Sequence, residues 1–179
     1  ETLKERWENE IKVVPLSALV MSIPINIEKL LGGNTVENNR IELKGGWNPD
    51  SIYRTICAFA NDFEDNGSGY IIVGVDENNG RPVRPVRGVP IETIDRIEKE
   101  MVGFNNLFEP FYMPRVSVED IDGKKVIVIW ALAGDRRPYK IPENVTAKHK
   151  TPKYFIRYNS STIEAKGENE MELIELANR

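Results

Sequence analysis

The apolar run YIIVGV, residues 70–75, constrains the fold more than any other stretch. It has the length of a strand and is apolar at nearly every position, which is typical of a strand covered on both faces. The segment before it, NPDSIYRTICAFANDFED, offers Asn48 as an N-cap and Pro49 at the first helical position. Earlier still, RIELKGG alternates apolar and charged residues, as a half-buried strand does. Strand, helix and strand with short links predict a β-α-β unit.

The rest of the chain predicts an α+β domain. IETIDRIEKEMVGF has apolar residues at helical spacing, and the strands of PRVSVEDIDGKKVIVIWAL flank Asp122-Gly123, a strong hairpin signal. KYFIRYN then predicts another strand, and residues 168–178 predict a closing helix. The predicted order is β-α-β-α-β-β with an additional C-terminal strand and flanking helices.

Three regions follow from these patterns. We expect residues 1–33 to form an N-terminal helical arm, residues 34–166 the domain, and residues 167–179 a C-terminal helix leading into a further downstream region. No apolar run approaches the roughly 18 residues that cross a bilayer, and no signal peptide opens the chain. The single cysteine, Cys57, lies among apolar residues and is interpreted as a core residue. These features predict a cytoplasmic location and no membrane partner.

Positive charge is concentrated in one part of the chain. Residues 123–157 hold nine Lys or Arg against two acidic residues, a net charge of +7, which leaves −11 for the remainder because the total is −4. This distribution predicts a basic face for phosphate contacts, with Tyr139 available to stack on an unpaired base. The alternative is a solvated, lysine-rich loop. The predicted nucleic-acid contacts are Lys124, Lys125, Arg136, Arg137, Lys140, Lys148, Lys150 and Arg157.

The stretch ENNRIELKGGW, residues 37–47, is unusually charged for a strand, with Glu37, Glu42 and Lys44 close together. Carboxylates at a strand end can hold Mg²⁺ or Mn²⁺, which prefer oxygen ligands. The alternatives are a strand edge that contacts phosphate and a plain solvated strand.

Three motifs resemble those of the Schlafen AlbA-like domain family. ENNRIELK resembles its E-x4-E-x-K opening, AFANDFEDNGSGYIIVGVDENNG its glycine-rich turn and strand, and YFIRYNSSTIEA its closing aromatic strand with a Ser-Ser-Thr turn. They occur in the family's order over roughly residues 35–165. The resemblance implies an Alba-like fold, which agrees with the predicted order of elements, and an interaction with nucleic acid. Bacterial members are described as transcriptional regulators or DNA-binding proteins.

Some eukaryotic relatives in this family cleave RNA with an acidic trio. The resemblance carries that trio to Glu37, Glu42 and Asp76, which would be catalytic and would bind Mg²⁺ or Mn²⁺, with Lys44 stabilising developing charge. Glu77 or Asp62 competes with Asp76 for the third place, and the acidic insertion DFEDNGSG replaces the family's tight glycine turn.

Three functions are therefore weighed. The first is the nucleic-acid-binding domain of a transcriptional regulator, contacting phosphates through a basic face. The second is a metal-dependent ribonuclease that uses the Glu/Glu/Asp trio. The third is a protein interaction module without nucleic acid. The sequence leaves open the choice between DNA and RNA and whether the chain forms a homo-oligomer.

Overall fold

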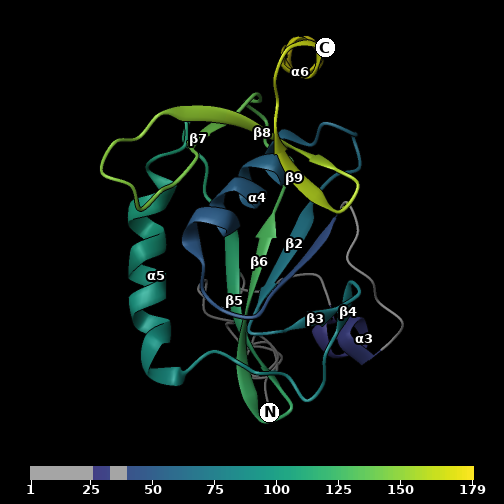
Figure 1. The fold of residues 1–179 in the computed structure, drawn as a ribbon, viewed down its shortest axis with the longest axis vertical. Coiled ribbons are helices and arrows are strands. Elements are labelled where there is room, and N and C mark those ends of the chain that lie inside the picture. The colour runs from purple at the N-terminus through teal and green to yellow at the C-terminus, as the bar shows by residue number, and fades with distance from the viewer. Residues whose placement is uncertain (1–25, 33–39) are drawn as a thin grey trace, which may run out of the picture.

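The computed structural model describes residues 26–32 and 40–179, so most of the predicted N-terminal helical arm, and Glu37, lie outside the described residues. The helices are α3 (Ile27–Gly32), α4 (Pro49–Asn61), α5 (Ile91–Asn105) and α6 (Glu168–Ala177). The strands are β1 (Ile41–Lys44), β2 (Gly69–Val73), β3 (Glu77–Asn78), β4 (Arg81–Pro82), β5 (Arg115–Ile121), β6 (Lys124–Ala131), β7 (Lys140–Pro142), β8 (Pro152–Tyr158) and β9 (Ser161–Glu164). The mixture of helices and sheets confirms the α+β prediction (Figure 1).

The main sheet has the strand order β1-β2-β6-β5. β1 and β2 are parallel and joined through α4, whereas β6 is antiparallel to both β2 and β5. The β-α-β unit and the β5–β6 hairpin are therefore confirmed. Asp122 and Gly123 at the hairpin turn have φ angles of 52° and 70°, the left-handed conformation that two-residue hairpins favour.

Both faces of this sheet are covered, as the apolar run predicted. Ile71 and Val73 belong to the core under α4, and Ile72 belongs to a second core that includes Ile27 and Leu31 of α3. Because successive residues of a strand point to opposite faces, a strand buried on both sides must be apolar at consecutive positions. In Figure 1, α4 lies across one face of the sheet.

A second sheet, β7-β8-β9, packs against α4 at the upper end of Figure 1. Asn61, buried at the end of α4, ties the two together. Its side-chain amide donates to the carbonyls of Tyr139 and Phe155 at 3.0 and 2.8 Å, and its oxygen accepts from the Tyr139 N–H at 2.6 Å. This places β8, and with it Arg157, beside the edge strand β1.

β3, β4, β7 and β9 were not among the predicted strands, whereas β8 and the closing helix α6 were. In the part of the chain that the structure describes, every helix is too short or too polar to span a bilayer.

Candidate functional site

A polar cavity of about 290 Å³ lies where β1, the start of α4 and the β8–β9 hairpin meet. Among the described residues, its lining has three cationic side chains, one carboxylate and five hydroxyl groups, and no apolar side chain. With Lys44, Arg54 and Arg157 against Glu42, the lining carries a net charge of +2. The lining residues are Glu42, Lys44, Ser51, Arg54, Thr55, Arg157, Ser160, Ser161 and Thr162.

Local geometry explains why these side chains share one cavity. Glu42 and Lys44 are two residues apart on β1 and so point to the same face of the sheet, the face that α4 covers. Ser51, Arg54 and Thr55 are spaced i, i+3, i+4 on α4 and therefore lie on one side of that helix.

The β8–β9 hairpin supplies the remaining wall of the cavity. Arg157 and Thr162 are directly opposite each other in the β8–β9 pairing, with Ser160 and Ser161 at the turn. The chain thus returns more than 100 residues after β1 to complete the same site.

The carboxylate of Glu42 lies between two cations. Its Oε2 is 2.6 Å from Nη2 of Arg157, a close ion pair without the angular geometry of a hydrogen bond, and its Oε1 is 3.2 Å from Nζ of Lys44. The side chains of Arg157 and Glu42 are 6% and 13% exposed. Such a buried pair is costly to break, because removing either partner leaves a desolvated charge.

Arg157 is held on several sides. Its Nη1 donates to the Thr162 hydroxyl at 3.0 Å, which in turn lies 2.9 Å from the Thr55 hydroxyl. Its guanidinium lies 5.3 Å from the centre of the Phe59 ring. The side chain is therefore buried and fixed in the wall of the cavity, and its contact with nucleic acid stays a prediction.

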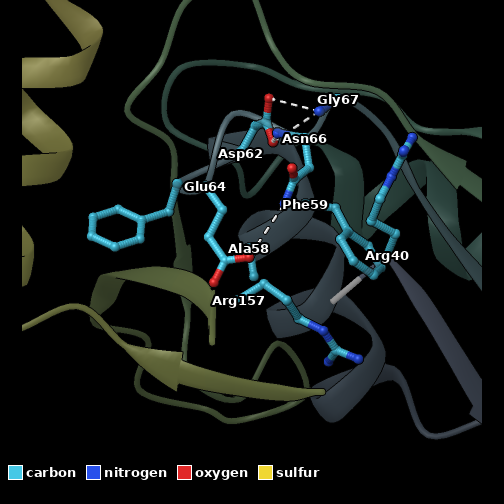
Figure 2. Close-up of a pocket in the computed structure, with 9 residues that line it drawn as sticks. Arg40, Ala58, Phe59, Asp62, Glu64, Asn66, Gly67 and Arg157 are labelled. Atoms are coloured by element: carbon cyan, nitrogen blue, oxygen red, sulfur yellow. Dashed lines mark hydrogen bonds between the residues drawn. The ribbon is translucent and has the colours of Figure 1, made fainter. Parts of the chain in front are cut away.

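On the other side of Arg157 is a smaller pocket of about 20 Å³, shown in Figure 2, with room for roughly one water molecule. Asp62 lines it and accepts backbone N–H bonds from Asn66 and Gly67. Burial raises the pKa of Asp62, while those hydrogen bonds and nearby Arg137 oppose the shift. Asp62 thus closes the turn after α4 and does not line the larger cavity.

Asp76 and Glu77, the other predicted acidic residues, contact partners other than those of Glu42. Asp76 forms a two-point pair with Arg87, at 3.0 Å to Nε and 2.9 Å to Nη2, and does not line the cavity. Glu77 accepts the Gly80 N–H in the β3–β4 turn.

Within residues 26–32 and 40–179, His, Cys, Asp and Glu side chains form no group of three that would suit a metal ion. The described carboxylates therefore do not gather into a site with three protein ligands. The trio that includes Glu37 stays a prediction, since that residue lies outside them.

The predicted basic residues fall at two ends of the molecule. Lys124 and Lys125 lie at the β5–β6 turn, the lower end in Figure 1, where Lys125 pairs with Asp120. Arg136, Arg137, Lys140, Lys148 and Lys150 follow the opposite end of β6. Because β6 has eight residues at about 3.3 Å each, roughly 23 Å of strand separates the two groups.

At the upper end, some predicted contacts already have structural roles. Tyr139 is 3% exposed and its hydroxyl accepts the Arg136 N–H, so the prediction that it stacks on a base is wrong. Arg137 donates to the carbonyls at the end of α4 and lies 3.7 Å from Asp62. Lys140 lies over the Tyr154 ring at 4.7 Å. Arg136, Lys148 and Lys150 are exposed.

Sequence reasoning missed Arg54 and the hydroxyl groups as site residues. Arg54 donates to the Glu143 carbonyl and the Asn144 side chain, and Asp50 accepts from the backbone and hydroxyl of Thr146. These bonds hold the loop that carries Lys148 and Lys150 against the start of α4. The Ser-Ser-Thr turn of the closing motif was a signal for the hydroxyls, but nothing in the sequence marks Arg54.

Comparison with known proteins finds a matching family model and solved structures of similar fold. The family model described as Schlafen, AlbA_2 matches residues 37–166. The DIP2311 protein of Corynebacterium diphtheriae is similar in fold, with 14% identity and a TM-score of 0.50, over 84% of this chain and 31% of that chain.

The N-terminal domain of a protein from Nitrosomonas europaea, described as ATP-dependent DNA helicase RecG-related, has 23% identity and a TM-score of 0.45, over 70% of this chain and 76% of that one. No curated protein matches significantly.

Proposed function

Because the chain belongs to the Schlafen AlbA_2 family, we propose that it binds nucleic acid and seats a backbone phosphate in the polar cavity. The observation that carries the proposal is the convergence of the first and last family motifs on that cavity. Glu42 and Lys44 come from the opening motif, and Arg157 with the Ser-Ser-Thr turn comes from the closing one. Residues so distant in sequence meet in a lining of hydroxyls and cations, the groups that recognise phosphate.

The chemistry of the lining favours the backbone over the bases. Lys44 and Arg54 line the cavity with partly exposed side chains, and the hydroxyls of Ser160 and Ser161 are available as donors at the β8–β9 turn. No aromatic ring of the described part of the chain lines the cavity, so stacking on a base has no support there. We therefore expect contacts that depend weakly on nucleotide sequence.

A path for further phosphates continues from the cavity. Arg54 connects it to the loop after β7, where Lys148 and Lys150 are exposed. Contacts to these lysines would extend the site along one strand of nucleic acid. The lysines of the β5–β6 turn, at the other end of the sheet, would have to contact a separate stretch of a longer ligand.

The test is fluorescence anisotropy with labelled single-stranded RNA, single-stranded DNA and duplex DNA over a range of salt concentrations. Lys44→Ala and Arg54→Ala should each weaken binding about tenfold and reduce the salt dependence by roughly one ion. Lys29→Ala, which removes the same charge on the opposite face of the sheet, is the matched control and should change little. Equal losses in all three variants would refute a phosphate site in the cavity.

The same assay addresses the finer functions. A preference for duplex DNA would support a role as the DNA-binding part of a transcriptional regulator, and a preference for RNA would not. Adding Mn²⁺ or EDTA and following the integrity of the ligand tests the ribonuclease prediction. Cleavage that needs Mn²⁺ and is lost in both Glu37→Ala and Glu42→Ala would support the Glu/Glu/Asp trio. Absence of binding to all three ligands at low salt would favour the interaction module.

A further inference from the structure

We infer that Glu42 is a built-in counter-anion, which holds the cations that a phosphate would contact and thereby sets the affinity of the site. This inference rests on the proposed function, since it concerns the same cavity. It assigns Glu42 a role opposite to that of a catalytic carboxylate: removing its charge should strengthen the site.

The contacts of Glu42 support this role. Both carboxylate oxygens face cations, Arg157 on one side and Lys44 on the other, and the side chain is 13% exposed. The carboxylate thus offsets part of the charge of the two cations that it contacts. It also presents negative charge to any anion that enters the cavity.

The balance of charge gives the consequence. With Glu42 ionised, the three cations of the lining are reduced to a net charge of +2, and without it the net charge is +3. A single phosphate must compete with Glu42 for Lys44 and Arg157. A polyanion can also contact Arg54 and the lysines of the loop after β7, which Glu42 does not neutralise. The arrangement therefore favours nucleic acid over small anions.

Glu42→Gln is the variant of choice, because the amide keeps the shape of the side chain and removes only its charge. Glu42→Ala is the second variant, and either one suffices if it folds, as judged by circular dichroism. The matched control is Glu164→Gln, which removes the same charge from a partly buried carboxylate that also lies between two lysines, Lys153 and Lys166. Glu164 does not line the cavity.

We expect the folded Glu42 variant to bind labelled oligonucleotide roughly tenfold more tightly than the wild type at about 0.1 M salt, with a steeper salt dependence. The Glu164→Gln control should stay within about twofold. A purely structural role for Glu42 would lower the melting temperature without steepening the salt dependence. Affinity equal to or below that of the wild type would overturn the inference.

A second readout separates this inference from the proposed function. Inorganic phosphate should raise the melting temperature of the Glu42 variant more than that of the wild type or of the Glu164→Gln control, because a ligand stabilises the state it binds. If no nucleic acid binds but phosphate shows this difference, the proposed function fails and the inference stands. If nucleic acid binds and neither readout differs, the inference fails and the proposed function stands.

Discussion

Asn61, the last residue of the AFAN stretch, should be one of the most sensitive positions for stability. Its side chain is 1% exposed and makes three hydrogen bonds to the backbone of β8 and of the residue that precedes β7. Asn61→Ala removes all three, so the Tyr139 N–H and the Phe155 carbonyl each lose a bond in a dry environment, and the Tyr139 carbonyl keeps the weaker bond from the Cys57 thiol. Buried polar groups left unsatisfied cost about 1 kcal/mol or more each, so we expect a loss of about 3 to 4 kcal/mol.

The loss is measurable by urea unfolding followed by circular dichroism. It should lower the melting temperature by about 6 to 16 °C, since 1 kcal/mol corresponds to about 2 to 4 °C in a chain of this size. Asn106→Ala is the matched control, because its amide donates to a helix carbonyl at the surface, and it should cost under about 0.5 kcal/mol. A loss below about 1 kcal/mol in Asn61→Ala would refute the reasoning that these bonds hold the second sheet to α4.

Three further predictions concern packing, acid stability and thiol reactivity. Gly69→Ala should lower the free energy of unfolding by about 1 to 3 kcal/mol, because the added Cβ would lie 2.3 Å from an aromatic carbon of α4. Gly46→Ala, whose Cβ would have nothing within 4 Å, is the control and should be neutral. Urea unfolding of both variants measures the two costs, and equal costs would contradict the prediction. Hydrogen bonds from Arg84 lower the pKa of Asp122 in the folded protein. Ionised Asp122 therefore stabilises the fold above the pKa of the unfolded state, and this stabilisation is lost as the pH falls through the pKa of the folded state. Asp122→Asn should therefore flatten the fall in unfolding free energy between about pH 4 and 2, and an unchanged slope would count against the pair. Burial raises the pKa of Cys57 to about 12. The thiol should therefore resist a thiol reagent at pH 8 in the native protein and react once the protein is unfolded in urea. Rapid reaction of the native protein would contradict this prediction.

Local patterns were enough to predict most of the fold. The N-cap at Asn48, the turn at Asp122-Gly123 and the apolar strand at residues 70–75 each act through neighbours in sequence, and the structure confirms all three. The short strands β7 and β9 were missed. Their few residues carry too little periodicity, and they form because β8 offers them a partner.

The candidate site was predicted only in part. Glu42 and Lys44 were predicted from the charge of their strand and from the resemblance to the family's opening motif, and they do line the cavity. Arg157 was predicted to share one basic face with the lysines of the β5–β6 turn. Sequence reasoning sums charges along the chain, and it cannot tell that Arg157 is buried against Glu42 while those lysines lie at the far end of β6.

The sequence by itself determined the elements, their order and the alternation that places Glu42 and Lys44 on one face of β1, because these depend on backbone preferences and on residues close together in the chain. Only the tertiary structure decided that Arg54 and the Ser-Ser-Thr turn join them, and that Arg157 meets Glu42 across a separation of 115 residues. Such long-range pairing depends on how α4 and the second sheet pack against β1. It is set by packing of side chains and by buried hydrogen bonds such as those of Asn61, which local patterns do not specify.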